Sequence, residues 1–169
     1  MYFSYKRIVN KIECSEKLIL NDADILSYGN KRICYYHAKN SSKIIKISRD
    51  PIHWEEGHRQ SLTEWHVSKK VKSADGACQI SLCHHWIKTN KGPGLVVDRI
   101  SDDKGESRTL RNLLFKRELT VKKAIDLVEE TIQNFSAFGV PASDFNIDNF
   151  ILPESVRPAP GSTSNPLTC

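Results

Sequence analysis

The sequence predicts an α+β fold, in which an antiparallel five-stranded sheet with one helix precedes a second, incomplete and mainly helical part. Short β-prone runs separated by turn residues fill the first hundred positions, and one helical segment interrupts them. The longest amphipathic stretch comes only later in the chain. We therefore expect an N-terminal lobe over residues 1–100, a partial helical lobe over 101–152 and a disordered tail over 153–169, where four of the seven prolines fall.

Composition narrows the class of protein. The chain has 169 residues, of which 39% are hydrophobic and 27% charged, as is typical of a globular domain. It has no apolar run of membrane-spanning length and no apolar signal segment at its start, so we expect a cytoplasmic location and no membrane partner. The net charge is +5, but basic and acidic residues interleave, which disfavours nucleic acid as a partner. The five cysteines lack C-x-x-C spacing and predict neither a disulfide framework nor a zinc site.

The first lobe begins with Leu18-Ile19-Leu20, which we expect to form a lead-in strand. Two β-prone runs then flank Gly29-Asn30, where we expect positive φ angles and a tight hairpin. A third strand follows at 43–48, and two more close the sheet. The expected strands of this sheet therefore lie within 25–37 (two), 43–48, 78–89 and 94–100.

Lys46 lies between two isoleucines of the third strand and has two interpretations. On an edge strand such a lysine is a charge that prevents aggregation. Facing the concave side of a glycine-turned hairpin, it reaches the phosphates of a nucleotide. The helix predicted over 62–73 begins with a capping box, because Ser61 is followed three residues later by Glu64. Glu64 therefore has either a capping role or an ion-pair role with Lys46.

The second lobe is predicted to contain a short helix from Ser107 to Phe115 and a long one between Thr120, its N-cap, and Gly139. The chain then enters a polar loop over 141–149 and a short strand at Phe150-Ile151-Leu152. The apolar face of the long helix, which we expect in the core, consists of Val121, Ala124, Ile125, Val128, Ile132 and Phe135.

The polar loop carries Asp144 and, five residues later, Asn149. This is the layout of a phosphotransferase catalytic loop, in which the Asp accepts a proton from the attacking hydroxyl and the Asn binds magnesium. The alternative is that both are ordinary loop residues that bond their own backbone.

Several of these motifs occur together and in one order. They resemble the YrbL family of PhoP regulatory network proteins, a small bacterial group related to the protein-kinase-like fold, over about residues 20–152. The motifs are Leu26-x-x-Gly29-x-x-Arg32-x-x-Tyr35-x-His37, Ile45-Lys46-Ile47, Glu64, Gly92-x-Gly94-Leu95-Val96 and Asp144-x-x-x-x-Asn149.

The resemblance implies that ATP with magnesium is held between the two lobes. Lys46 would contact the α- and β-phosphates, and Glu64 would hold Lys46. Asp144 would be the catalytic base and Asn149 a magnesium ligand. The residues assigned to the nucleotide are Gly29, Arg32, Lys46, Glu64, Val97 and Arg99.

The chain departs from the kinase pattern in three ways. The hairpin has one glycine instead of G-x-G-x-x-G, Ala142 and Ser143 replace the His-Arg before the catalytic Asp, and no further Asp follows Asn149 to bind magnesium. Relative to the family pattern, we expect the chain to be C-terminally truncated. We therefore expect a pseudokinase-like ATP-binding protein with weak or no phosphate transfer to an unknown acceptor. An active small-molecule or protein kinase and a basic nucleic-acid-binding or plain interaction module are the alternatives.

Overall fold

The computed structural model describes residues 17–49, 54–73, 80–101, 105–137, 139 and 146–152. The chain divides into two compact units, Met1–Arg99 and Ile100–Cys169. The tail over 153–169, expected to be disordered, lies outside the described residues. Among the described helices, none is long and apolar enough to cross a membrane.

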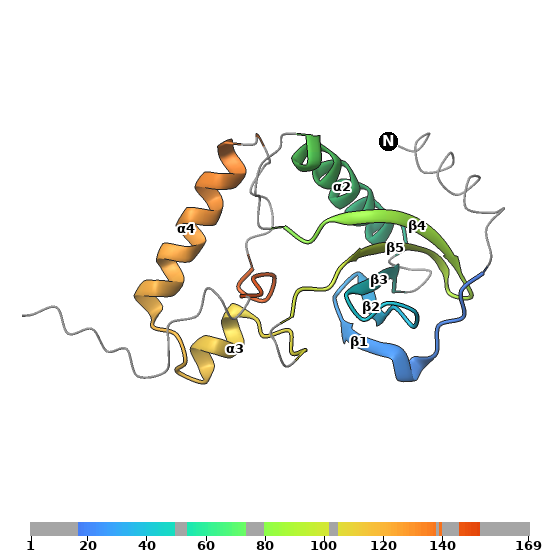
Figure 1. Cartoon of the computed structure of the whole chain (residues 1–169), viewed down its shortest axis with the longest axis horizontal. Helices are drawn as coiled ribbons and strands as arrows, with labels where there is room; N and C mark the ends of the chain where they lie inside the picture. The colour runs from blue at the N-terminus through green and yellow to red at the C-terminus, as the bar shows by residue number, and fades with distance from the viewer. Residues whose placement is uncertain are drawn as a thin grey trace, which may run out of the picture. The chain divides into compact units, whose positions relative to one another are not determined.

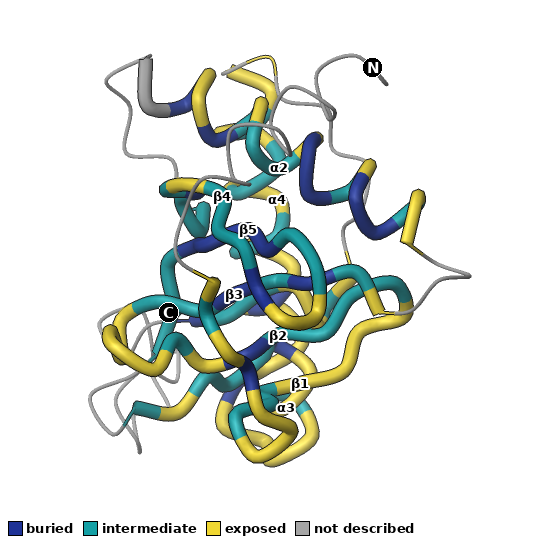
Figure 2. The backbone as a smooth tube through the Cα atoms, turned by 90° about the vertical axis from the view of Figure 1, so that its right-hand side faces the viewer, coloured by how far each residue is buried: buried dark blue, intermediate teal, exposed yellow. Residues whose placement is uncertain are grey.

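The first unit contains an antiparallel five-stranded sheet, which confirms the α+β class and the sheet predicted from the sequence (Figure 1). Most of the deeply buried residues of the sheet lie on its central strands β3 and β5, which are rich in β-branched residues (Figure 2). In spatial order the strands are β1 (Ile25–Tyr28), β2 (Arg32–Tyr36), β3 (Lys43–Ser48), β5 (Gly92–Asp98) and β4 (Cys83–Thr89).

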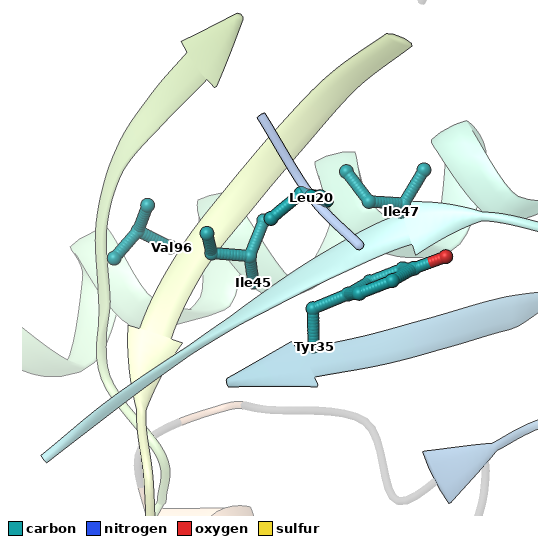
Figure 3. Packing of buried hydrophobic residues seen from close by; sticks show 5 residues of the cluster. All are labelled: Leu20, Tyr35, Ile45, Ile47 and Val96. Atoms are coloured by element: carbon teal, nitrogen blue, oxygen red, sulfur yellow. The ribbon is translucent and has the colours of Figure 1, made fainter. Parts of the chain in front are cut away.

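One face of the sheet is covered by the segment that precedes β1. Leu18 forms a bridge with Thr89 of the edge strand β4, whereas Ile25 begins β1 at the opposite edge, so residues 18–24 must cross this face. The crossing places Leu20 in a buried apolar cluster, and the side chain of Asn90 bonds both the backbone N–H and the C=O of Leu20. The expected lead-in strand is therefore a single bridge. Figure 3 shows the cluster, which consists of Leu20, Tyr35, Ile45, Ile47 and Val96.

The opposite face packs against helix α2 (Trp54–Ser73). The predicted start of this helix at residue 62 is wrong, because the helix begins at Trp54 and carries two glutamates in its first turn, where they favour the helix dipole. Ser61 therefore lies inside the helix, where its hydroxyl donates to the Gly57 carbonyl at 3.0 Å instead of capping the N-terminus. The buried residues of α2 include Gly57, Ser61 and Ser68 as well as the apolar Leu62 and Val71, and Trp65 packs against the apolar cluster of the sheet.

The hairpins differ from the prediction in their backbone angles. Among the described residues, positive φ occurs at Gly92, Gly105, Gly139 and Arg117, and not at Gly29 or Asn30. A three-residue connection joins β1 and β2, so the strands close without a primed two-residue turn, and the Gly29 N–H donates to the Arg32 carbonyl at 2.8 Å. A positive φ occurs instead in the hairpin between β4 and β5, where Gly92 has φ 104°.

The expected boundaries of the last two strands also shift. β4 begins at Cys83, since residues 80–82 are not in a strand and residues 78 and 79 lie outside the described residues. β5 begins two residues earlier than expected, at Gly92, and ends at Asp98.

The second unit contains α3 (Leu110–Phe115), capped by the Thr109 side chain, and α4 (Val121–Ala137). Val121 and Ile125 are exposed, so the prediction that both lie in the core is wrong. Ile151 forms one bridge with Thr109 instead of a strand. The core of this unit consists of Leu110, Leu113, Leu119, Ala124 and Leu152, with Leu127 and Val128 packed against it.

We expect Gly57→Ala to destabilise the protein although alanine is the better helix former. A Cβ at this position would lie 2.7 Å from the Lys31 carbonyl oxygen and 2.7 Å from the Ser48 hydroxyl. The overpacking should cost about 1–3 kcal/mol, against about 1 kcal/mol gained in helix propensity. Urea unfolding measures the net change in the free energy of unfolding. Thr63→Ala, on the exposed side of the same helix, is the control and should change it by less than about 0.5 kcal/mol. A Gly57→Ala protein clearly more stable than the wild type would contradict the close approach.

Candidate functional site

Lys46 lies on β3, which is hydrogen-bonded to β2 on one side and to β5 on the other. The interpretation of Lys46 as an edge-strand charge is therefore wrong. Strand alternation directs Ile45 and Ile47 into the apolar cluster and turns Lys46 to the opposite face, toward α2. The lysine side chain is only 18% exposed, so its ammonium group is largely withdrawn from water.

Glu64 of α2 receives this lysine. The Lys46 Nζ lies 3.2 Å from Oε1 and 3.1 Å from Oε2 of the Glu64 carboxylate. The early start of α2 removes the capping interpretation, because Glu64 is well inside the helix and its side chain points to the sheet. Of the two roles that the sequence left open for Glu64, the ion pair is the one present.

Arg32, the first residue of β2, is a second cation on the same carboxylate. Its Nη2 donates to Glu64 Oε1 at 2.6 Å, and its Nη1 donates to the Ser61 hydroxyl at 3.3 Å. The side chain is 13% exposed. Arg32 is register partner of Ser48, two positions along β3 from Lys46, so both cations approach Glu64 from the same face of the sheet.

Sequence reasoning assigned Arg32 to the nucleotide and missed its bonds to Glu64 and Ser61. Ser61 and Glu64 lie three residues apart, and this helical spacing could have indicated a shared partner. The same spacing also fits a capping box, which is how it was interpreted.

The charges in this cluster are strongly coupled. Burial raises the pKa of Glu64, but Lys46 and Arg32 more than offset burial and lower that pKa to about 2. Burial lowers the pKa of Arg32, and the Glu64 carboxylate outweighs that effect and raises it. The cluster therefore holds two cations and one anion at neutral pH and keeps one net positive charge. Such a site can accept an additional anion.

The other residues assigned to the nucleotide are not gathered in this cluster. Val97 is fully buried beside Cys83 and Leu95, and its register partner on β3 is Ile44. The Arg99 guanidinium lies over the Tyr36 ring at 4.9 Å. Gly29 follows β1 at the hairpin. The described contacts thus bring together Arg32, Lys46 and Glu64.

A second polar cluster, formed by Lys43, His84 and Asp98, was not anticipated. Asp98 Oδ1 accepts from Lys43 Nζ and lies 2.7 Å from His84 Nε2, while its Oδ2 accepts from the Leu82 N–H at 3.2 Å. Burial raises the pKa of Asp98, but the bonds from Lys43 and His84 outweigh it, so the pKa is lowered. The three residues come from three different strands, and no spacing along the chain signals their meeting.

The catalytic-type loop is described only in part. Asp144, the expected base, lies outside the described residues. Asn149 is exposed, and its N–H donates to the Asn146 carbonyl at 2.7 Å. Asp148 accepts from Arg111 Nε at 2.6 Å. In the part of the chain that the structure describes, no group of three or more His, Cys, Asp or Glu side chains could hold a metal ion.

Replacing either cation should raise the pKa of Glu64 from about 2 toward the value of 4.5 that an isolated side chain has. Arg32→Met and Lys46→Met each remove one of the two charges that favour the ionised carboxylate. Carbon-13 NMR of the Glu64 carboxyl group during a pH titration measures this pKa. Arg59→Met is the control, because Arg59 pairs with Glu56 and should leave the Glu64 pKa unchanged.

The same pKa has a consequence for stability. Because the folded pKa lies below the unfolded one, the stabilising effect of ionised Glu64 is complete above about pH 4.5 and is lost as the pH falls toward 2. In both variants the free energy of unfolding should therefore fall less across this pH range than it does in the wild type. A Glu64 that titrates near 4.5 in the wild type would contradict the described ion pairs.

A family model described as PhoP regulatory network protein YrbL matches residues 18–157, which is most of the chain. The chain therefore belongs to this family, as its motifs indicated. No curated protein matches it.

Proposed function

We propose that this member of the YrbL family binds ATP with magnesium at the cluster of Arg32, Lys46 and Glu64, and acts as a pseudokinase-like regulatory module. The observation that carries the proposal is the Glu64 carboxylate held between Lys46 of β3 and Arg32 of β2. The three side chains lie on an antiparallel sheet with one helix, in the element order expected of a kinase N-lobe.

The energetics of the cluster favour a functional role. Withdrawing charges from water costs about as much as an ion pair returns, so a largely buried cluster of this kind is weak evidence for added stability. Titratable groups with shifted pKa values are instead enriched at functional sites. The pKa of Glu64 is lowered to about 2, and among the residues that the structure describes the cluster has two cations for one carboxylate. Phosphate oxygens are the natural partners of such a charge.

The chemistry of the donors fits a nucleotide. In protein kinases a strand lysine pairs with a helix glutamate and contacts the nucleotide phosphates, and Lys46 and Glu64 would take these roles. The backbone near Gly29 would cover the phosphates, and Val97 and Arg99 would lie near the base. Magnesium would arrive on the phosphates, with Asn149 as a protein ligand.

Phosphate transfer by this 169-residue chain is proposed to be weak or absent. Asp144 would act as the base, but the chain carries no Asp after Asp148 to serve as the further magnesium ligand that kinases use. Binding without efficient turnover would suit a regulatory role in the PhoP network.

Calorimetry with ATP and magnesium, run beside a phosphate-transfer assay, tests the proposal. We expect binding, and we expect Lys46→Met to weaken it by about 10-fold or more, because a charge-assisted bond to phosphate is worth about 1.5–3 kcal/mol. Lys39→Met is the charge-matched control, since Lys39 is exposed in the turn between β2 and β3, and its affinity for ATP should stay near that of the wild type.

Three outcomes would change the assignment. No ATP binding would end the proposal. Efficient transfer that Asp144→Ala abolishes would make the chain an active kinase. Steeply salt-dependent affinity for DNA or RNA, without affinity for ATP, would favour the nucleic-acid alternative.

A further inference from the structure

We infer that Arg32 is a positioning residue, which stays on Glu64 and thereby leaves Lys46 available to a phosphate group. The inference deepens the proposed function and rests on it for the class of ligand, a polyphosphate chain. Arg32 and Lys46 contact the same carboxylate with different geometry, and we assign them different roles.

Arg32 is fixed to α2 at two points. Its guanidinium donates to the Glu64 carboxylate at 2.6 Å and to the Ser61 hydroxyl at 3.3 Å, and these residues are one helical turn apart. Ser61 donates its own proton to the Gly57 carbonyl, so a lone pair of its oxygen is left to accept from Arg32. A planar guanidinium with several donors suits such a two-point contact. Removing Arg32 from Glu64 would break both bonds.

Lys46 is held more loosely. Its ammonium group lies 3.2 and 3.1 Å from the two Glu64 oxygens, distances longer than the 2.7–2.9 Å usual for charge-assisted bonds. A lysine is a compact charge on a flexible stem with three donors, so it can turn toward a new anion while keeping part of its first contact. Lys46 is therefore the cation that a ligand can recruit.

Arg32 lowers the free-energy cost of moving Lys46 from Glu64 to a phosphate. Without Arg32, moving Lys46 to a phosphate would strand the charge of Glu64, whose side chain is only 34% exposed. Leaving a largely buried charge without its partner is strongly unfavourable. With Arg32 in place the carboxylate stays neutralised. Arg32 should thus raise the affinity for phosphate without touching the phosphate.

Inorganic tripolyphosphate, titrated by calorimetry into the full chain, tests this role in a double-mutant cycle. Arg32→Gln should weaken binding by about 10-fold or more, because Glu64 then retains Lys46 and the cluster loses its net charge. Adding Glu64→Gln to Arg32→Gln should restore the affinity to within about threefold of the wild type, because one net positive charge returns and Lys46 is released.

Three results would overturn the inference. An Arg32→Gln, Glu64→Gln double variant as weak as Arg32→Gln would mean that Arg32 contacts the phosphate itself. Unchanged affinity in Arg32→Gln would mean that Arg32 only supports the fold. Failure of the wild type to bind tripolyphosphate would remove the anion site. Circular dichroism and urea unfolding establish that each variant is folded.

Arg32→Lys keeps the inference testable if Arg32→Gln does not fold. The lysine keeps a cation beside Glu64 but loses the two-point contact. The affinity of Arg32→Lys should therefore stay well above that of a folded variant, such as Arg32→Met, that has no charge at position 32 and retains Glu64. NMR of the Glu64 carboxyl supplies a readout that a purely structural role would not move, since its pKa should stay well below 4.5 when tripolyphosphate saturates the wild type. A rise to that value would overturn the inference. ATP that binds no better than tripolyphosphate would contradict the nucleotide and leave the role of Arg32 standing.

Discussion

The ionised carboxylate of Glu64 is the constraint on which the first unit depends, because it joins β2, β3 and α2 at one point. α2 also approaches the sheet closely at small residues: Gly57 lies against the Lys31 carbonyl, and the Ser68 hydroxyl accepts the Cys83 N–H at 2.8 Å. Trp65 adds apolar packing on the same helix. The directional hydrogen bonds and charges add a fixed orientation to this packing.

The two faces of the sheet differ in the polar groups that they carry. On one face, Leu20 from the crossing segment completes an apolar cluster with Ile45 and Ile47. On the other, the alternate position Lys46 meets Glu64 of the helix. A lysine on a central strand is costly unless a partner neutralises it, and α2 supplies that partner. The α2 face also carries a buried apolar cluster of Cys83, Leu95 and Val97, so the charged cluster is added to a face on which apolar packing is already present.

Local signals in the sequence account for what was predicted correctly. β-branched runs separated by turn residues specified the five strands, and they needed no knowledge of distant contacts. The start of α2 was missed because Gly57 is a poor helix former and because the spacing of Ser61 and Glu64 also fits a capping box, although the two glutamates of the first turn favour a helix. Val121 and Ile125 were wrongly assigned to the core. The helical period identifies a broad apolar stripe, but it does not show which edge of that stripe packs against the rest of the unit. The contact between Arg32 and Glu64 joins residues 32 positions apart. It depends on the register of the strands, which local sequence patterns do not predict.

The comparison between the two polar clusters explains why one is a candidate binding site and the other is not. Asp98 is matched by a single lysine, and its remaining capacity is used by the His84 ring and the backbone N–H of Leu82, so its charge is balanced by bonds that tie three strands together. Glu64 instead faces two residues that are both cationic at neutral pH. A structural clamp needs charge balance, and any excess raises the cost of burial without strengthening the clamp. The surplus cation beside Glu64 therefore makes sense if an anion completes the cluster, and the looser geometry of Lys46 identifies the group that would meet it.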